Sequence, residues 1–200
     1  MQKIFTEVVR GDIEAVRARI EQAPELVHAV ATGSPQKFNS QSLLQVAIRS
    51  DQYAIAHMLL DLGADPNFID RGAPSGWESP VLLDAVAAAA VHSRGGGGEK
   101  RWEDQAFEIL SRMLDEGADV TATDTHQSNA LTRAALIAND VLPKSGEPIP
   151  PEQDANLTRI FDALVRHGAD LGQVDPLIGM TMIEYYQGMP VLKYLVGDAG

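Results

Sequence analysis

The tripeptide Gly-Ala-Asp occurs three times in the chain, each time after a short apolar segment. The three segments read LLDLGADPNFID (residues 59–70), MLDEGADVTATD (113–124) and LVRHGADLGQVD (164–175). In each segment a second Asp stands five positions after the first. A fixed offset that returns three times indicates a repeated structural unit, which constrains the fold more than any other feature of this sequence.

The residues around each Gly-Ala-Asp predict a helix that ends there. Glycine adopts the left-handed conformation that closes a helix, so Gly63, Gly117 and Gly168 should each follow a helical segment. The apolar positions with helical spacing before them are Ile55, Met58, Leu59 and Leu62; Ile109, Met113 and Leu114; and Ile160, Phe161 and Leu164. The first Asp of each copy can accept backbone N–H groups in the turn that follows. A turn-rich stretch and another helix come after each second Asp, which makes the unit a turn, an inner helix and an outer helix.

This unit resembles an ankyrin repeat. Ankyrin repeats have inner helices that open T-P-L-H-x-A, and they close on Gly-Ala-Asp before a hairpin finger. The closing motifs match well, whereas the openings here read SLLQVA, PVLLDA, NALTRA and TMIEYY. The resemblance extends over nearly the whole chain. It implies an all-α ankyrin-repeat solenoid that binds other proteins without catalysis.

The spacing between motifs predicts one domain over residues 1–200 with five units. They cover residues 1–37, 38–68, 69–122, 123–173 and 174–200, the first and last being caps. From the inner-helix leucine to the closing glycine, the second unit spans nineteen positions, the third thirty-five and the fourth thirty-seven. We expect the sixteen and eighteen extra residues to lie between inner and outer helices, in HSRGGGGEKRWEDQ and NDVLPKSGEPIPPEQD. The four glycines and the prolines predict mobile loops at 94–98 and about 141–151.

Charge and composition narrow the classes of partner. The net charge of −12 argues against nucleic acid, which needs clustered Lys and Arg. Residues 51–200 carry twenty-three acidic and ten basic groups, so a basic protein is the favoured partner, although solubility alone also explains such a surface. No apolar run suggests a signal peptide or a membrane span, and there is no cysteine. We therefore expect a cytoplasmic location and no contact with membranes.

The sequence offers no convincing site for catalysis, a metal or a cofactor. RGGGGEK (94–100) lacks the Gly-Lys-Ser/Thr order of a phosphate-binding loop. The five histidines have no metal-ligand spacing, and no nucleophile motif occurs. The carboxylate pairs Glu103-Asp104 and Asp115-Glu116 are interpreted as solvated surface, because neighbouring side chains on a helix diverge by about 100°.

By position in the family, the fingers and the exposed side of the inner helices supply the binding surface. The candidate residues are Arg49, Phe68, Arg71, Trp77, Glu78, Asp84, Thr125, His126 and Gln127, with Ser50 and Leu136 beside them. Trp77 lies in the lengthened finger RGAPSGWESP and is either an exposed anchor for a partner or a brace for its own loop. Trp102 is expected to pack on the neighbouring outer helix.

Three functional hypotheses follow. Arg outnumbers Lys eleven to five, and Ala is abundant, as in GC-rich bacterial proteomes. The leading hypothesis is an inhibitor of the immunity-protein type that binds a basic toxin or enzyme. The alternatives are an adaptor or scaffold, including an exported one, and an enzyme with a site composed from several units.

Overall fold

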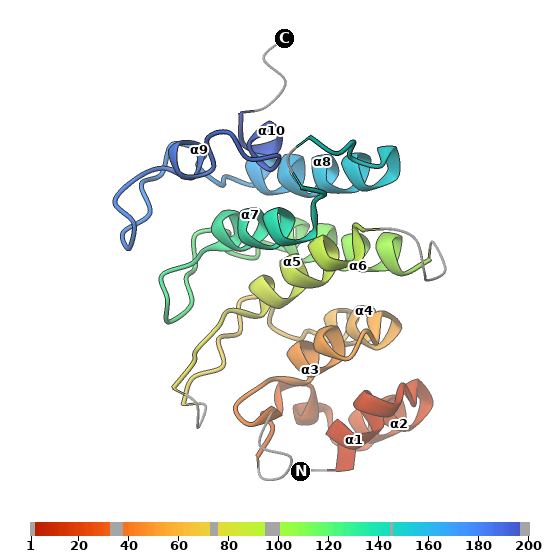
Figure 1. Cartoon of the computed structure of the whole chain (residues 1–200). Helices are drawn as coiled ribbons and strands as arrows, with labels where there is room; N and C mark the ends of the chain where they lie inside the picture. Colours follow the sequence, from red (N-terminus) through yellow and green to blue (C-terminus); the bar gives the residue numbers. More distant parts are fainter. Residues whose placement is uncertain (1–2, 33–37, 73–75, 95–100, 145, 197–200) are drawn as a thin grey trace.

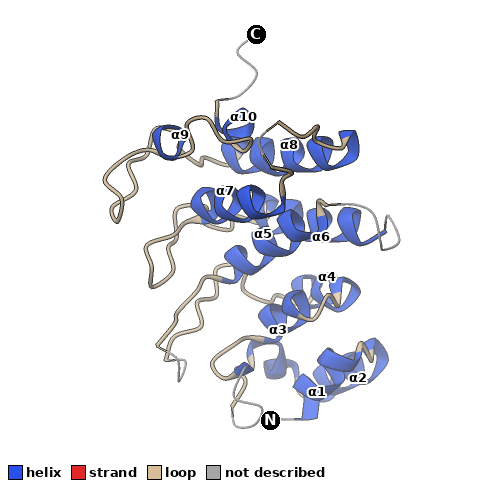
Figure 2. Ribbon diagram, viewed as in Figure 1, coloured by secondary structure: helices blue, strands red, loops and turns tan. Residues whose placement is uncertain are grey.

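The computed structural model describes residues 3–32, 38–72, 76–94, 101–144 and 146–196. Within these residues the chain forms helices and turns, and Figure 2 shows no strand there. The elements are α1 (Lys3–Arg10), α2 (Ile13–Gln22), the 3-10 helix η1 (Pro24–His28), α3 (Leu43–Arg49), α4 (Tyr53–Asp61), α5 (Val81–His92), α6 (Arg101–Asp115), α7 (Ala130–Val141), α8 (Pro151–Arg166), α9 (Met182–Tyr185) and α10 (Leu192–Leu195). This all-α architecture confirms the predicted fold class.

Successive helix pairs stack on one another along the chain (Figure 1). The inner helices α3, α5 and α7 contact their neighbours in order, and so do the outer helices α4, α6, α8 and α10. Buried apolar side chains from all the pairs form one continuous core. Stacking buries the apolar face of each unit, because one pair of helices cannot bury that face by itself.

The links between pairs project on one side of the stack as fingers (Figure 1). The first, second and fourth fingers are residues 30–42, 69–80 and 174–181, and one antiparallel bridge closes the base of each. The third finger, residues 124–128, is closed by the hydrogen bond from the Asp124 N–H to the Ser128 carbonyl, at 3.0 Å. The inner helices lie toward the fingers and the outer helices lie away from them.

The repeated glycines end the outer helices, as predicted. Gly63, Gly117 and Gly168 have φ of +88°, +86° and +99°. After α4, the Gly63 N–H donates to the Leu60 carbonyl and the Ala64 N–H to the Leu59 carbonyl, the paired bonds of a Schellman motif. The same two bonds recur after α6 and α8. The glycine is needed for its backbone conformation alone, because a Cβ at any of the three would meet nothing within 4 Å.

The extra residues of the third and fourth units lie mainly in longer helices, which corrects the expectation that they form loops. Helix α5 has 12 residues against 7 in α3, and α6 has 15 against 9 in α4, which accounts for eleven of the sixteen. Helices α7 and α8, with 12 and 16 residues, account for twelve of the eighteen. Residues 95–98 of the predicted first loop lie outside the described part of the chain. In the second loop, Leu142 is buried and Ile149 packs against the core.

Polar contacts join the outer helices, and these contacts revise the interpretation of the carboxylate pairs. Asp104 and Asp115 of α6 contact Arg159 and His167 at 3.0 and 3.1 Å, rather than facing only water. At the other two junctions Asp61 pairs with Arg112 at 2.7 Å, and Asp154 with Lys193 at 2.6 Å. Half-exposed pairs of this kind add little stability individually, typically below about 1 kcal/mol, but they specify how neighbouring outer helices align.

Two predictions about apolar residues have different outcomes. Trp102 packs edge-on against Tyr53 of the neighbouring outer helix α4, with ring centroids 6.0 Å apart, as expected. Leu62 does not join the buried stripe and is 43% exposed. The reason is geometric, because Leu62 is the C-cap residue of α4, where the chain already leaves the helix.

We expect Gly117→Val to lower the free energy of unfolding by about 1 kcal/mol or more, because it forces a β-branched residue into the left-handed region. Gly117→Asn is the matched control, since Asn tolerates that region and should cost less. Urea unfolding followed by circular dichroism measures both variants. Equal stability of the two would contradict the assignment of the cost to backbone conformation.

Candidate functional site

The two aspartates of each repeated motif have different structural roles. The first Asp of each copy accepts the backbone N–H two residues later at 2.8 Å, in Asp65, Asp119 and Asp170. The second Asp of each copy is buried, with 3%, 3% and 9% exposure for Asp70, Asp124 and Asp175. These buried carboxylates accept backbone N–H groups of their own fingers. The fixed offset in the sequence therefore separates a turn residue from a finger-base residue.

The second and third fingers are joined directly to each other. The Glu78 N–H donates to the Thr125 hydroxyl at 2.8 Å, and the Thr125 N–H donates to the Glu78 carbonyl at 3.0 Å. The Trp77 ring packs on the His126 ring with a centroid distance of 4.4 Å. Four of the predicted site residues thus meet where the two fingers touch. We name this group, Trp77, Glu78, Thr125 and His126, the finger junction.

Trp77 also contacts the inner helix behind the fingers. The Arg133 guanidinium of α7 lies 5.7 Å from the centre of its ring and pairs with the buried carboxylate of Asp124. The Trp77 side chain remains 36% exposed. Of the two expectations for Trp77, the structure shows an exposed ring that is held by the next finger.

Asp84 and Arg49 belong to a polar cluster on the inner helices α3 and α5. Asp84 accepts the Gln45 Nε2–H at 2.8 Å and pairs with Arg49 at 3.2 Å. The same Gln45 nitrogen donates to Asp70 at 3.3 Å, so a single amide links two carboxylates. Burial raises the pKa of the Asp84 carboxyl. Burial also raises the pKa of Asp70, to about 6, and the nearby Asp84 charge adds to this effect.

The remaining predicted residues are spread over the fingers and helices. Arg71 and Gln127 are exposed, and Gln127 has a φ of +59° at the tip of the third finger. Phe68 is half-buried against the core, and its carbonyl accepts the Val81 N–H at 2.9 Å. Leu136 is 46% exposed on α7.

Sequence reasoning missed Gln45 and Arg133. A usable signal exists for Arg133, because Asp84 and Arg133 occupy the same place in the openings PVLLDA and NALTRA. The Arg133 charge acts on Asp84 and partly offsets the effect of burial on its pKa. Opposite charges at one repeat position in adjacent units therefore indicate an electrostatic interaction between stacked helices. Gln45 is fully buried and carries no comparable signal.

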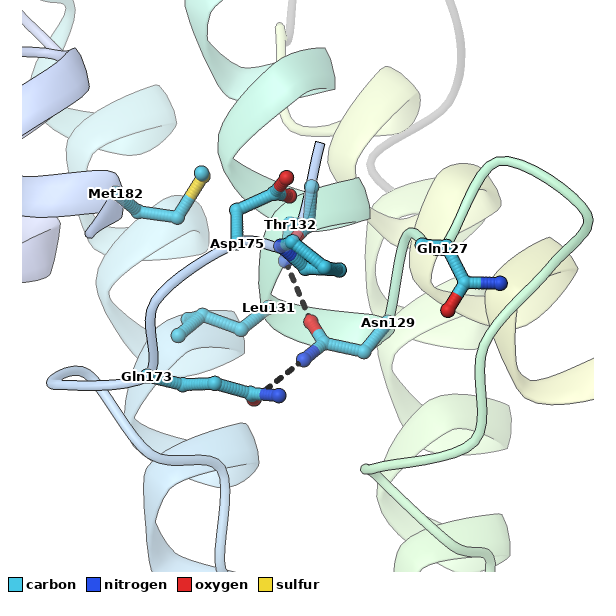
Figure 3. Close-up of a pocket in the computed structure, with 8 residues that line it drawn as sticks. Gln127, Asn129, Leu131, Thr132, Gln173, Asp175 and Met182 are labelled. Atoms are coloured by element: carbon cyan, nitrogen blue, oxygen red, sulfur yellow. Dashed lines mark hydrogen bonds between the residues drawn. The ribbon is translucent and has the colours of Figure 1, made fainter. Parts of the chain in front are cut away.

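A small hollow lies between the third and fourth fingers (Figure 3). Asn129 spans it, donating to Gln173 at 2.8 Å and accepting the Thr132 N–H at 2.9 Å. The volume of the hollow is about 10 Å³, which is room for roughly one water molecule. The hollow is too small to be a site for an organic ligand.

The described residues offer little to other kinds of site. They contain no cluster of three His, Cys, Asp or Glu side chains able to hold a metal ion. No helix among them has both the length and the apolar character needed to cross a lipid bilayer. What the arrangement provides is a row of fingers beside the inner helices.

Comparison with known proteins agrees with this geometry. Residues 39–68 match the family model described as an ankyrin repeat. The chain has the fold of an ankyrin-repeat solenoid. An ankyrin repeat domain from Acinetobacter baumannii superposes with a TM-score of 0.53 at 21% sequence identity, covering 96% of this chain and 95% of that one. That likeness concerns the fold alone.

Two further solved structures resemble this chain less closely. One is a chain of the complex between a predatory endopeptidase of Bdellovibrio bacteriovorus and an immunity protein, with a TM-score of 0.48, 15% identity, and coverage of 99% and 98%. The other is the ankyrin repeat domain of Bcl-3, of the IkappaB protein family, with a TM-score of 0.39, 16% identity, and coverage of 98% and 99%. No curated protein sequence matched the chain.

The raised pKa of Asp70 predicts an unusual dependence of stability on pH. Between about pH 4 and pH 6 the folded protein keeps a proton on Asp70 that the unfolded chain, with a pKa of about 3.9, has released. This group therefore lowers stability as pH rises through that window. We expect Asp70→Asn to remove the effect, so the variant should gain on the order of 2 kcal/mol relative to wild type between pH 4 and pH 7.

Asp124→Asn is the matched control for this prediction, because Asp124 occupies the same place in the third finger but pairs with Arg133. Its substitution breaks an ion pair and should lower stability at pH 7. Urea unfolding at both pH values gives the free energies. A difference between wild type and Asp70→Asn that does not change with pH would contradict the prediction.

Proposed function

We propose that this ankyrin-repeat solenoid is a non-catalytic module that binds a partner protein through its second and third fingers and the adjacent inner helices. The finger junction carries this proposal. Two hydrogen bonds between Glu78 and Thr125, each donated by a backbone N–H, and the ring contact of Trp77 with His126 hold the fingers together without a partner. A surface that is already assembled loses little conformational entropy on binding.

Trp77 is the anchor that we propose for this face. Its ring is held between the third finger and Arg133, yet about a third of it stays exposed. An aromatic side chain held in one orientation is the usual kind of residue on which binding energy concentrates. The Arg133 guanidinium is in turn held by its ion pair with Asp124, so the group that packs on the ring has a fixed position.

We propose that the partner is basic, because the chain carries a net charge of −12. Of the two acids among the candidate residues, Asp84 contributes little to this because it is paired with Arg49, whereas Glu78 keeps its charge while it accepts the Gly72 N–H at 3.2 Å. The attraction would come from the surface as a whole. Such a field mainly raises the rate of association, and salt screens it over about 8 Å at physiological ionic strength.

The specific role that we propose is inhibition of a basic toxin or enzyme, in the manner of an immunity protein. Fast, charge-steered association and a rigid anchor both favour a protein that must occupy its target before the target acts. An adaptor or scaffold needs the same binding face, so the effect on the partner's activity distinguishes these roles.

The test begins with the partner that co-purifies with the tagged, full-length protein from the cells that make it. Once that partner is identified and purified, binding kinetics are measured with wild type and Trp77→Ala. We expect Trp77→Ala to accelerate dissociation, at a cost of about 2 kcal/mol or more. Added salt should slow association and leave dissociation of the wild type nearly unchanged.

Val165→Ala is the control, because Val165 is 40% exposed on the outer helix α8 and lies away from the fingers. It should leave both rates close to wild type. An acidic partner, or unchanged dissociation for Trp77→Ala, would refute the assignment of this face. A partner that keeps its full activity in the complex would argue against inhibition and favour a scaffold.

A further inference from the structure

The last helix pair and the finger before it expose an unusual amount of apolar surface. The side chains are Val174 (55% exposed), Leu177 (64%), Ile178 (38%), Met180 (38%), Tyr185 (47%) and Met189 (42%). We name these six residues the C-terminal apolar surface. They lie on the fourth finger, on α9 and on the link to α10, at the dark blue end of the stack in Figure 1. Large apolar side chains that gather in one segment and stay exposed require an explanation.

The fourth finger is an ordered hairpin, which shows that its apolar side chains are not a collapsed loop. Asp175 is buried at its base and accepts the N–H groups of Leu177 and Ile178 at 2.9 and 3.2 Å. The Asp175 N–H donates to the Met180 carbonyl at 3.0 Å, and its carbonyl accepts the Gly179 N–H at 2.8 Å. With its backbone satisfied from the inside, the finger turns Leu177 and Ile178 outward.

The third finger shows that such a hairpin does not need apolar residues at its tip. There a buried Asp again organises the backbone, but the residues that follow it are Thr125, His126 and Gln127. The fold therefore requires the aspartate and leaves the tip residues free to vary. Leu177 and Ile178 are exposed for a reason other than folding.

The Asp and Glu residues along this stretch of the sequence are not matched by Lys or Arg. No Lys or Arg occurs between Arg166 and Lys193, and Lys193 is paired with Asp154. The acids Asp170 and Glu184 flank the fourth finger and are exposed. A complementary surface would be an apolar cleft bordered by cationic side chains.

We propose that the C-terminal apolar surface inserts into an apolar, basic-rimmed cleft of a partner protein. A second copy of this chain fits poorly, because it would bring the same acids together on chains that each carry a net charge of −12. An anionic lipid surface is disfavoured for the same reason. This proposal extends the proposed function and rests on it only for the premise of a basic protein partner, since the contact residues are distinct from the finger junction.

The test places a photoreactive phenylalanine analogue at Leu177 in the full-length protein, in the cells that make it. The same analogue at Val165 is the control, because Val165 is 40% exposed on the outer helix α8 and away from the fingers. We expect a crosslink to a different, basic protein from position 177 and none from position 165. The crosslinked protein is then purified, and its affinity is measured directly.

The double variant Leu177→Gln, Ile178→Gln should bind that protein at least tenfold more weakly, whereas Val165→Gln should bind as wild type does. Circular dichroism should show both variants folded, since the substituted side chains are exposed. Sedimentation of the protein alone tests for association with a second copy of this chain. Flotation with phosphatidylglycerol vesicles tests for binding to an anionic lipid surface. A crosslink to this same chain, binding to the vesicles, or no crosslink from position 177 would overturn the proposal.

The outcomes separate this proposal from the preceding one. If Trp77→Ala weakens binding of the partner and the Leu177 and Ile178 substitutions do not, only the role of the C-terminal apolar surface is refuted. If the reverse holds, the finger junction is refuted and the C-terminal apolar surface stands.

Discussion

The buried carboxylate at the base of a finger is the interaction on which the binding side of this molecule depends. The second, third and fourth fingers have only a few backbone hydrogen bonds at their bases, so they lack the ladder that satisfies a longer hairpin. The aspartate supplies the missing acceptors. Burying a charge there is costly, and the fingers offset that cost differently. Asp124 has a cation, Arg133, whereas Asp70 has the neutral amide of Gln45 and a raised pKa.

These aspartates also engage the polar and charged side chains of the inner helices. Arg133 reaches from α7 to Asp124 and at the same time lies against Trp77. On the preceding helices, Arg49 pairs with Asp84, which shares Gln45 with Asp70. Structural charges on this side are thus largely compensated within the protein. A partner would meet the exposed ring of Trp77 against a background that is locally balanced, although the whole molecule is strongly negative.

The sequence predicts well what depends on neighbouring residues. Helix ends at Gly63, Gly117 and Gly168 follow from local backbone preference, and so do the turns after them. Helix extent within the insertions was not predictable in this way, because the decision to continue a helix depends on packing against the adjacent unit. The contacts of Trp77 and Asp104 were also hidden, since His126 and Arg159 lie about fifty residues further along the chain. Those contacts exist only once the stack has formed.

The lengths of the outer helices have a consequence for how firmly each part of the stack is held. The outer helices α6 and α8 have 15 and 16 residues, whereas the outer helix α10 and its inner partner α9 have four residues each. In a linear array each unit is stabilised by its neighbours alone, so local opening is easier in a unit made of short helices. The C-terminal apolar surface thus belongs to a segment that is built from short helices. A partner that grips it would also suppress that opening, and amide hydrogen exchange in α9 and α10 would slow on binding even where the partner makes no contact.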